Sequence, residues 1–172
     1  MARIRQAEFP GDAPAVRRLF DGYVDFLLGR VEPALRVAIE TKYGPEYRAG
    51  AAAEFARLHV PPAGALLLAQ DGEGPVGCGM MRMLSPDVAE LQRIFVQEAG
   101  RGQGHGRALT LALIEAARGA GAERVRLDTG GPLVEAIALY RALGFREVAP
   151  YHDAYPALQP YLRFFELDLR DG

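Results

Sequence analysis

The 172-residue chain has little of several residue types, and each shortage argues against a class of protein. With a single cysteine, Cys78, it cannot form an internal disulfide, which argues against a secreted disulfide scaffold and for a reducing compartment. No apolar run approaches the roughly 20 residues of a membrane-spanning helix, and the first residues show no signal-peptide pattern. With 20 basic and 22 acidic residues, the chain also lacks the basic field of a dedicated nucleic-acid binder.

The length and the hydrophobic content of 49% predict one domain over residues 1–172 with a core of its own. Together with the single cysteine, they lead us to expect a cytoplasmic protein. The three histidines, His59, His105 and His152, are far apart and have no cysteine or carboxylate at ligand spacing, so the sequence predicts no metal site. Nineteen of the twenty basic residues are arginine, and Lys42 is the only lysine. We attribute this mainly to compositional bias, although a site that needs forked anion-binding groups would also favour arginine.

Hydrophobic periodicity and turn residues predict an alternation of strands and helices. The predicted strands are 3–7, 65–69, 76–84, 88–96, 124–128, 145–148 and 161–169. The predicted helices are 12–28 with Asp12 as N-cap, 33–58 with a break at Gly44-Pro45, 107–118 and 132–143. This order indicates an α/β fold, in which a mixed sheet has helices on both faces.

The glycine-rich loop 101–106 carries the clearest functional signal. Its glycines let the backbone turn tightly, and the helix that follows adds the positive end of its dipole, so the segment suits a pyrophosphate. Arg101 and Arg107 flank it with permanent charge. A P-loop is excluded because arginine and alanine stand where that motif has Lys-Ser/Thr. Two alternatives stay open. One is an unused glycine turn; the other is a dinucleotide fingerprint from Gly102, imperfect at Arg107 but supported by Asp128.

Three blocks in the second half of the chain resemble the GNAT superfamily of N-acetyltransferases. The loop 101–106 matches the Gln/Arg-x-x-Gly-x-Gly/Ala motif of that family, and 90–96 resembles the strand that precedes it. The block 136–145 is similar to the family signature A-x-x-L-Y-x-x-x-G-F. The resemblance implies a GNAT-like fold, in which the fourth and fifth strands of the central sheet splay apart, and acetyl-CoA as the co-substrate.

The resemblance also implies which residues hold acetyl-CoA. The main chain of Ile94 to Val96 would bind the acetyl-pantetheine end, and an N–H near Phe95 or Val96 would stabilise the oxyanion. The pyrophosphate would lie on the amides of Gly102 to Gly106. The residues expected to bind acetyl-CoA are Ile94, Phe95, Val96, Arg101, Gly102, Gln103, Gly104, His105, Gly106 and Arg107. One departure is Leu133, where many relatives have an asparagine that touches the cofactor.

Tyr140 and Glu90 are the expected catalytic residues. Tyr140 matches the family tyrosine that faces the CoA sulfur, which predicts a general acid; a core aromatic is the alternative. Glu90 stands early on a strand where several relatives carry a glutamate, and alternation puts it on one face with Gln92, Ile94 and Val96. We expect Glu90 to act as the base, directly or through water; a solvated strand-end carboxylate is the alternative.

Three further residues receive structural interpretations. His105 contributes its backbone N–H to the loop rather than its imidazole. Cys78 is a small buried strand residue, because no His-Asp pair lies near it in the sequence to activate it. Asp128 is a strand-end or cap residue.

The predicted activity is transfer of an acetyl group to a primary amine of a small molecule or amino-acid-like acceptor, by direct attack in a ternary complex. The first helix pair and the late loop would bind the acceptor; they contain Tyr23, Asp25, Arg30, Tyr43, Tyr47, Tyr151, His152, Asp153 and Tyr155. A peptide N-terminus is also compatible. Neither nucleic acid nor a membrane is expected as a partner, and a homodimer is left open. The alternatives are a non-catalytic acyl-CoA-binding module and a nucleotide-dependent oxidoreductase.

Overall fold

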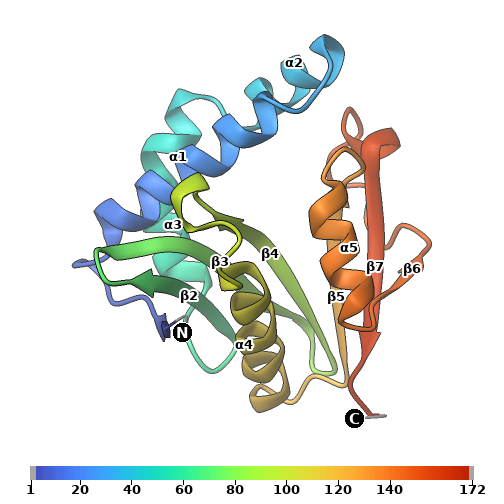
Figure 1. Ribbon diagram of the computed structural model, residues 1–172. Coiled ribbons are helices and arrows are strands. Elements are labelled where there is room, and N and C mark those ends of the chain that lie inside the picture. The colour runs from blue at the N-terminus through green and yellow to red at the C-terminus, as the bar shows by residue number, and fades with distance from the viewer. Residues whose placement is uncertain (1–2, 171–172) are drawn as a thin grey trace.

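The apolar segments of the chain build a seven-stranded mixed sheet with helices on both faces, in a computed structural model that describes residues 3–170 (Figure 1). The strands are β1 (Arg3–Gln6), β2 (Gly64–Asp71), β3 (Gly74–Ser85), β4 (Val88–Val96), β5 (Arg124–Gly130), β6 (Arg146–Val148) and β7 (Leu162–Asp168). The helices are α1 (Ala13–Leu28), α2 (Pro33–Lys42), α3 (Pro45–Leu58), α4 (His105–Gly119) and α5 (Val134–Ala142), with short 3-10 turns η1 (Glu98–Gly100) and η2 (Gln159–Tyr161). The sheet order is β1-β2-β3-β4-β5-β7-β6, so the predicted α/β class is confirmed.

The predicted elements are all present, and their ends differ by a few residues. Helix α4 begins at His105, two residues before its predicted start, so the end of the glycine loop belongs to its first turn. Helix α5 begins at Val134, two residues later than predicted. Asp12 occupies the N-cap position of α1, but its carboxylate accepts hydrogen bonds from Arg5 (2.6 Å) and from the Glu8 amide (2.7 Å) instead of capping the helix. Across the described part of the chain, no helix has both the length and the apolar character needed to cross a membrane.

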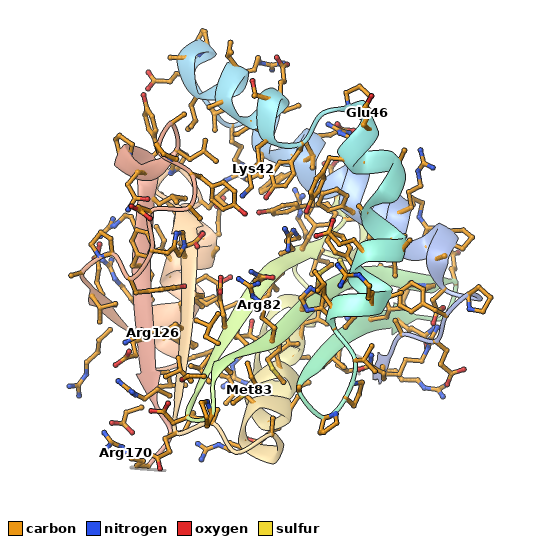
Figure 2. All side chains as sticks on the ribbon, turned by 180° about the vertical axis from the view of Figure 1, so that it is seen from behind. Lys42, Glu46, Arg82, Met83, Arg126 and Arg170 are labelled. Carbon is orange, nitrogen blue, oxygen red and sulfur yellow. The ribbon has the colours of Figure 1, made fainter. Side chains whose placement is uncertain are left out.

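Helices α1, α2 and α3 cover one face of the sheet, and their aromatic residues form the centre of the packing. Phe20 of α1 has its ring centroid 5.1 Å from that of Phe55 on α3 and 5.6 Å from that of Tyr43, which follows α2. These rings lie on Leu66 and Met80 of the sheet. Figure 2, which views the molecule from behind, shows α3 crossing in front of the strands.

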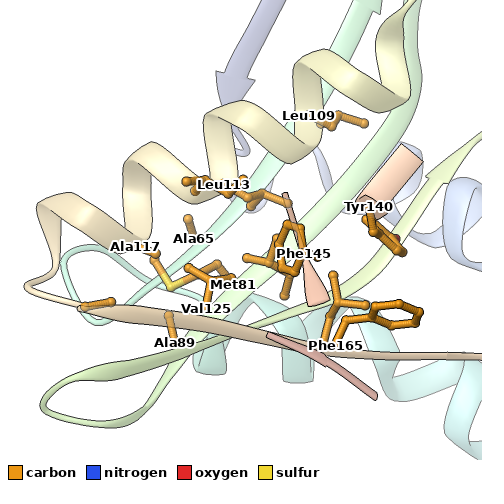
Figure 3. Packing of buried hydrophobic residues seen from close by; sticks show 14 of the residues in the cluster. Ala65, Met81, Ala89, Leu109, Leu113, Ala117, Val125, Tyr140, Phe145 and Phe165 are labelled. Carbon is orange, nitrogen blue, oxygen red and sulfur yellow. The ribbon is translucent and has the colours of Figure 1, made fainter. Parts of the chain in front are cut away.

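Helices α4 and α5 cover the opposite face. Leu109, Leu113 and Ala117 of α4 recur at four-residue spacing, so they lie on one side of the helix and pack on the sheet as a fully buried stripe (Figure 3). Tyr140 of α5 joins the same cluster, with its ring centroid 5.8 Å from that of Phe145. The sequence therefore buries one helical face on each side of the sheet.

A bulge in β4 reverses the direction of its side chains. Between Cys78 and Met80 the register of β3 shifts, because β4 has one residue more than β3 at this point. Arg93 lies in this bulge with φ of 50°, the only positive φ of a non-glycine residue within 3–170. A strand alternates its side chains only where it is regular, so the pattern before the bulge does not continue beyond it.

The predicted common face of Glu90, Gln92, Ile94 and Val96 is therefore wrong beyond the bulge. Gln92 pairs with Met80, which belongs to the cluster under α1, α2 and α3, so Glu90 and Gln92 point to that side. Ile94 and Val96 pack instead against the cluster under α4. The extra residue therefore puts the even-numbered residues before the bulge and those after it on opposite faces of the sheet.

Strands β4 and β5 separate soon after they pair. Their parallel pairing covers only Val88–Glu90 of β4 and Arg124–Arg126 of β5. In Figure 1 the two strands then diverge, with β1 to β4 on one side and β5, β7 and β6 on the other. The predicted splay between the fourth and fifth strands is confirmed.

At Gly77, β3 lies close to both β4 and α4. A Cβ at this position would lie 2.8 Å from the Phe95 carbonyl oxygen and 3.2 Å from Cδ1 of Leu109. We expect Gly77→Ala to lower the free energy of unfolding by about 1–3 kcal/mol, the usual cost of overpacking. Gly72→Ala, in the open β2–β3 turn with no atom within 4 Å, should change it by less than about 0.5 kcal/mol. Urea denaturation measures both variants, and equal midpoints would contradict the close approach.

Candidate functional site

A pocket of about 320 Å³ opens where β4 and β5 diverge. Strands β4 and β5 form its floor, α1 and α2 form one wall, and α5 with the late loop 151–162 forms the other. Its ionisable and hydroxyl-bearing lining residues include Tyr23, Lys42, Tyr43, Arg82, Glu90, Arg93, Asp128, Tyr140, Tyr151, His152 and Tyr155. Both residues that the sequence proposed as catalytic, Glu90 and Tyr140, thus face the same space.

Glu90 is held in the pocket floor by two hydrogen bonds. Its Oε2 accepts from Arg82 at 3.2 Å, and its Oε1 accepts from the Gln92 side-chain amide at 3.1 Å. The residue is only 5% exposed, so the alternative of a solvated strand-end carboxylate is wrong. A carboxylate has about four lone-pair sites, so Glu90 can still accept a hydrogen bond from an amine in the pocket.

Asp128 and His152 form a direct pair beside Glu90. The distance between His152 Nε2 and Asp128 Oδ2 is 2.6 Å, although 24 positions separate them in the sequence. One ligand atom from each of Glu90, Asp128 and His152 lies within 4.8 Å of the other two. Of the two interpretations of Asp128, the cap is wrong; it is a strand residue near the end of β5, and it also lines the pocket. Likewise, His152 is far from Glu90 and Asp128 along the sequence but not in the fold.

Tyr140 is both a core aromatic and a pocket residue, so its position is compatible with either role that the sequence left open. Its ring packs in the α4 cluster beside Phe145 and Phe165, and the residue is 7% exposed (Figure 3). It also lines the pocket. Burial, together with the negative charge of Asp128, raises the pKa of the Tyr140 hydroxyl well above its ordinary value. The phenol therefore stays protonated at neutral pH and can donate a proton.

Tyr151 adds a second phenol near the two carboxylates. Its hydroxyl is buried and has no hydrogen-bond partner among the residues that the structure describes. Burial is the main cause that raises its pKa, and the charges of Glu90 and Asp128 act in the same direction. This part of the pocket therefore gathers two carboxylates, one imidazole and two neutral phenols.

The glycine loop presents backbone amides at the N-terminus of α4. Gly102 and Gly104 have φ of 76° and 81°, and a Cβ on either would meet no atom within 4 Å. The first backbone bond of α4 runs from the Ala108 amide to the Gly104 carbonyl (3.0 Å), so the amides just before Ala108 lie in the unpaired first turn. Open space, free amides and the helix dipole together fit a diphosphate group.

Two side chains of the loop bind the protein itself. Arg101 donates from Nε to the Val96 carbonyl at 3.1 Å, which ties the loop to the end of β4, and Gln103 donates to the carbonyl of Ala99. His105 is buried, and both ring nitrogens lack hydrogen-bond partners in the part of the chain described. Arg107 is exposed. The arrangement favours the backbone of the loop, rather than its side chains, as the anion-binding element.

Of the expected residues at the end of β4, Phe95 and Val96 do not line the pocket. Ile94 lines the pocket, as does Leu133, which stands at the position of the family asparagine. The Phe95 ring packs between Tyr23 and Phe26 of α1, at centroid distances of 6.2 and 6.0 Å. The hydrophobic side chain of Phe95 thus fixes the backbone of this segment under α1.

About half of the expected acceptor residues line the pocket, namely Tyr23, Tyr43, Tyr151, His152 and Tyr155. The others bind elsewhere or face solvent: Asp25 pairs with Arg48, Arg30 pairs with Glu135, Tyr47 accepts from Arg93, and Asp153 is exposed. The pocket also contains Arg93, Gln92 and Lys42, which the sequence did not single out as pocket residues. For Lys42 a signal existed, since a single lysine stands among nineteen arginines.

A family model described as "Acetyltransferase (GNAT) family" matches residues 32–145, which is more than half of the chain and includes β4, the loop and α5. The chain belongs to the GNAT acetyltransferase family. Among its GNAT relatives is the uncharacterized N-acetyltransferase C1271.07c of Schizosaccharomyces pombe, 32% identical over 98 residues. The match covers 56% of this chain and 60% of that relative, so the chain spans less than two thirds of its length.

Solved GNAT structures share the fold over nearly the whole chain. The acetyltransferase of the GNAT family from Staphylococcus aureus superposes with a TM-score of 0.72 at 17% identity, covering 99% of this chain and 100% of that one. The yncA protein of Salmonella typhimurium, whose structure contains its cofactor acetyl-CoA, gives a TM-score of 0.70 at 20% identity, covering 100% and 96%. At these identities the likeness shows the fold.

Cys78 should be inert to thiol reagents in the native protein. It is buried in β3, and burial raises its pKa to about 12. Its thiolate is then roughly a thousandfold or more rarer at pH 8 than that of a free cysteine. We expect no reaction with a disulfide reagent at pH 8 in the native state and one thiol per chain after denaturation in guanidinium. Rapid labelling of the folded protein would contradict the burial.

Proposed function

We propose that this protein is an acetyl-CoA-dependent N-acetyltransferase, which transfers the acetyl group to a primary amine of a small or amino-acid-like acceptor by direct attack in a ternary complex. The observation that carries the proposal is the convergence of Glu90 and Tyr140 on one pocket, at the divergence of β4 and β5. Family membership and the acetyl-CoA bound to the yncA protein support the choice of co-substrate.

The loop and the end of β4 would hold acetyl-CoA. The amides of Gly102 to Gly106, at the positive end of α4, would bind the pyrophosphate. The main chain of Ile94 to Val96, on the edge of β4 that β5 has left, would bind the pantetheine arm. When bound, acetyl-CoA supplies an activated acetyl group as a thioester.

The pocket residues would then accept and donate the protons that acetyl transfer requires. An acceptor arrives as an ammonium and must lose a proton before its lone pair can attack; Glu90 takes that proton. An N–H of Phe95 or Val96 stabilises the oxyanion that forms on the thioester carbonyl. The C–S bond then breaks, and Tyr140 donates its phenolic proton to the leaving sulfur. The raised pKa of Tyr140 keeps this proton in place until the sulfur departs. The nitrogen gives up its second proton as the amide forms, and that proton returns to Tyr140 through solvent.

One domain over residues 1–172 would carry the whole site, in the cytoplasm, with a homodimer left open. The observation that favours a small acceptor over a peptide is the modest volume of the pocket, about 320 Å³. The second candidate function is a non-catalytic acyl-CoA-binding module, which the same loop would serve.

Substitution of Gly104 tests the anion-binding role of the loop. A valine at this position would fill the open space above the amides, and its φ of 81° adds backbone strain. We expect Gly104→Val to weaken acetyl-CoA binding at least tenfold by calorimetry.

The matched control for strain is Gly121→Val. Gly121 lies between α4 and β5 with φ of 94° and a nearest Cβ contact of 3.9 Å, far along the chain from the loop. This variant should lose comparable stability and keep its affinity for acetyl-CoA. If Gly104→Val binds as tightly as Gly121→Val, the loop does not hold the pyrophosphate.

Removal of the Tyr140 hydroxyl separates the enzyme from the binding module. General acid catalysis contributes about 10²–10⁴-fold, so Tyr140→Phe should lower kcat by that order and leave acetyl-CoA affinity nearly unchanged. Steady-state kinetics with a panel of amines, beside a melting curve for the variant, measures this. An unchanged kcat under conditions where chemistry limits the rate would assign Tyr140 to the core alone. Acetyl-CoA binding without transfer to any amine would favour the non-catalytic module.

A further inference from the structure

Two cations face the pocket without an acidic partner. Lys42, the last residue of α2, projects between the two halves of the sheet, where Figure 2 labels it. Arg93 lies in the β4 bulge beneath it. Within residues 3–170, neither forms an ion pair with a carboxylate, whereas most other arginines in the chain do. A charge that is partly removed from water without a partner is unfavourable, so a partner is expected from outside the chain.

Arg93 is fixed in this position at a cost. Its positive φ is strained for a non-glycine residue, and its Nε is buried without a hydrogen-bond partner in the described residues. One terminal nitrogen donates to the Tyr47 hydroxyl at 3.1 Å, and the guanidinium lies 4.9 Å from the centroid of the Phe55 ring. These contacts are neutral, so they hold the guanidinium in place and leave its charge available to an anion.

Aromatic rings hold Lys42 in the same way. Its Nζ lies 3.4 Å from the centroid of the Tyr155 ring and 4.7 Å from that of Tyr43. Burial is the main cause that lowers the pKa of Lys42, and the charge of Arg93 acts in the same direction. Tyr155 and the charge of Asp128 instead raise this pKa. A bound anion would add to the effect of Asp128.

Gln92 links this cationic end of the pocket to the anionic end. Its side-chain oxygen accepts from Arg93 at 3.2 Å, and its side-chain nitrogen donates to Glu90 at 3.1 Å. One carboxamide therefore spans the two ends at this point. In an α-amino acid, the amino nitrogen and the carboxylate carbon are bonded to the same carbon atom. The nitrogen and oxygen of a carboxamide are likewise bonded to one carbon, so the two spacings are similar.

We propose that the acceptor is an α-amino acid, whose carboxylate binds between Lys42 and Arg93 while its amino group lies at Glu90 and Asp128. This inference rests on the proposed function and assigns the two cations as specificity-determining residues. The apolar wall formed by Leu27, Leu35 and Ile39 favours an amino acid with a hydrophobic side chain. A decarboxylated amine keeps the reacting group but leaves both cations unpaired.

The test compares hydrophobic amino acids with the amines that remain when the carboxylate is removed: leucine with 3-methylbutylamine, phenylalanine with phenethylamine, and tyrosine with tyramine. Hydrogen bonds to charged groups are typically worth enough for a 10- to 100-fold effect, so kcat/KM for the amino acid should exceed that of its amine by about this factor. O-Phosphoethanolamine is included as an amine with a different anion.

Variants assign the preference to the two cations. In Lys42→Met and Arg93→Met the ratio of kcat/KM for amino acid over amine should fall toward one, and Lys42→Arg should restore part of it. Arg57→Met removes the same charge from an exposed position of α3 outside the pocket, and its ratio should equal that of the parent. Acetyl-CoA affinity and a melting curve show that each variant is folded; if Arg93→Met fails to fold, Lys42→Met decides.

The outcomes separate this inference from the proposed function. Three outcomes overturn the inference while acetyl transfer stands. The decarboxylated amines react with equal or higher kcat/KM, no amino acid is acetylated, or Lys42→Met keeps the ratio of the parent protein. A preference for O-phosphoethanolamine overturns the carboxylate. Failure of the parent protein to bind acetyl-CoA would instead overturn the proposed function.

Discussion

The early separation of β4 from β5 is the constraint on which the whole site depends. Only three residues of each strand pair, and beyond Glu90 and Arg126 the backbone edges face an open space. The bulge at Arg93 then reverses β4, so that Ile94 and Val96 pack under α4 while Glu90 and Gln92 face α1 and α2. A continuous ladder would have closed the pocket and placed these side chains in one regular alternation.

The pocket holds its negative and positive side chains in different places. Glu90, Asp128 and His152 gather at one end, and Lys42 and Arg93 lie at the other. Such groups are expensive to hold away from water unless each has a partner, and within residues 3–170 the carboxylates have basic partners, whereas the cations lack acidic ones. This asymmetry is a property of the folded chain, because the net charge of the sequence is only -2.

Tyr140 has a structural position in the core and a proposed chemical role in the pocket. Its ring fills the core beside Phe145 and Phe165, and this same burial keeps its hydroxyl protonated. The two interpretations of Tyr140 that the sequence left open are therefore compatible. Arg101 is a comparable case, because its guanidinium binds the carbonyl of Val96 and so positions the loop whose backbone amides face outward.

The sequence by itself determined where the helices and strands lie, and it singled out the glycine loop and Tyr140 as candidate site residues. Helical periodicity, turn glycines and a short motif each lie within a few consecutive residues, so they can be recognised without the fold. It was wrong about the face of β4, since one extra residue in the bulge becomes visible only when β4 pairs with β3. Only the tertiary structure brought Asp128 to His152 and Lys42 to Arg93. Each of these pairs joins residues far apart in the chain, and their meeting depends on how the sheet, α2 and the late loop pack together.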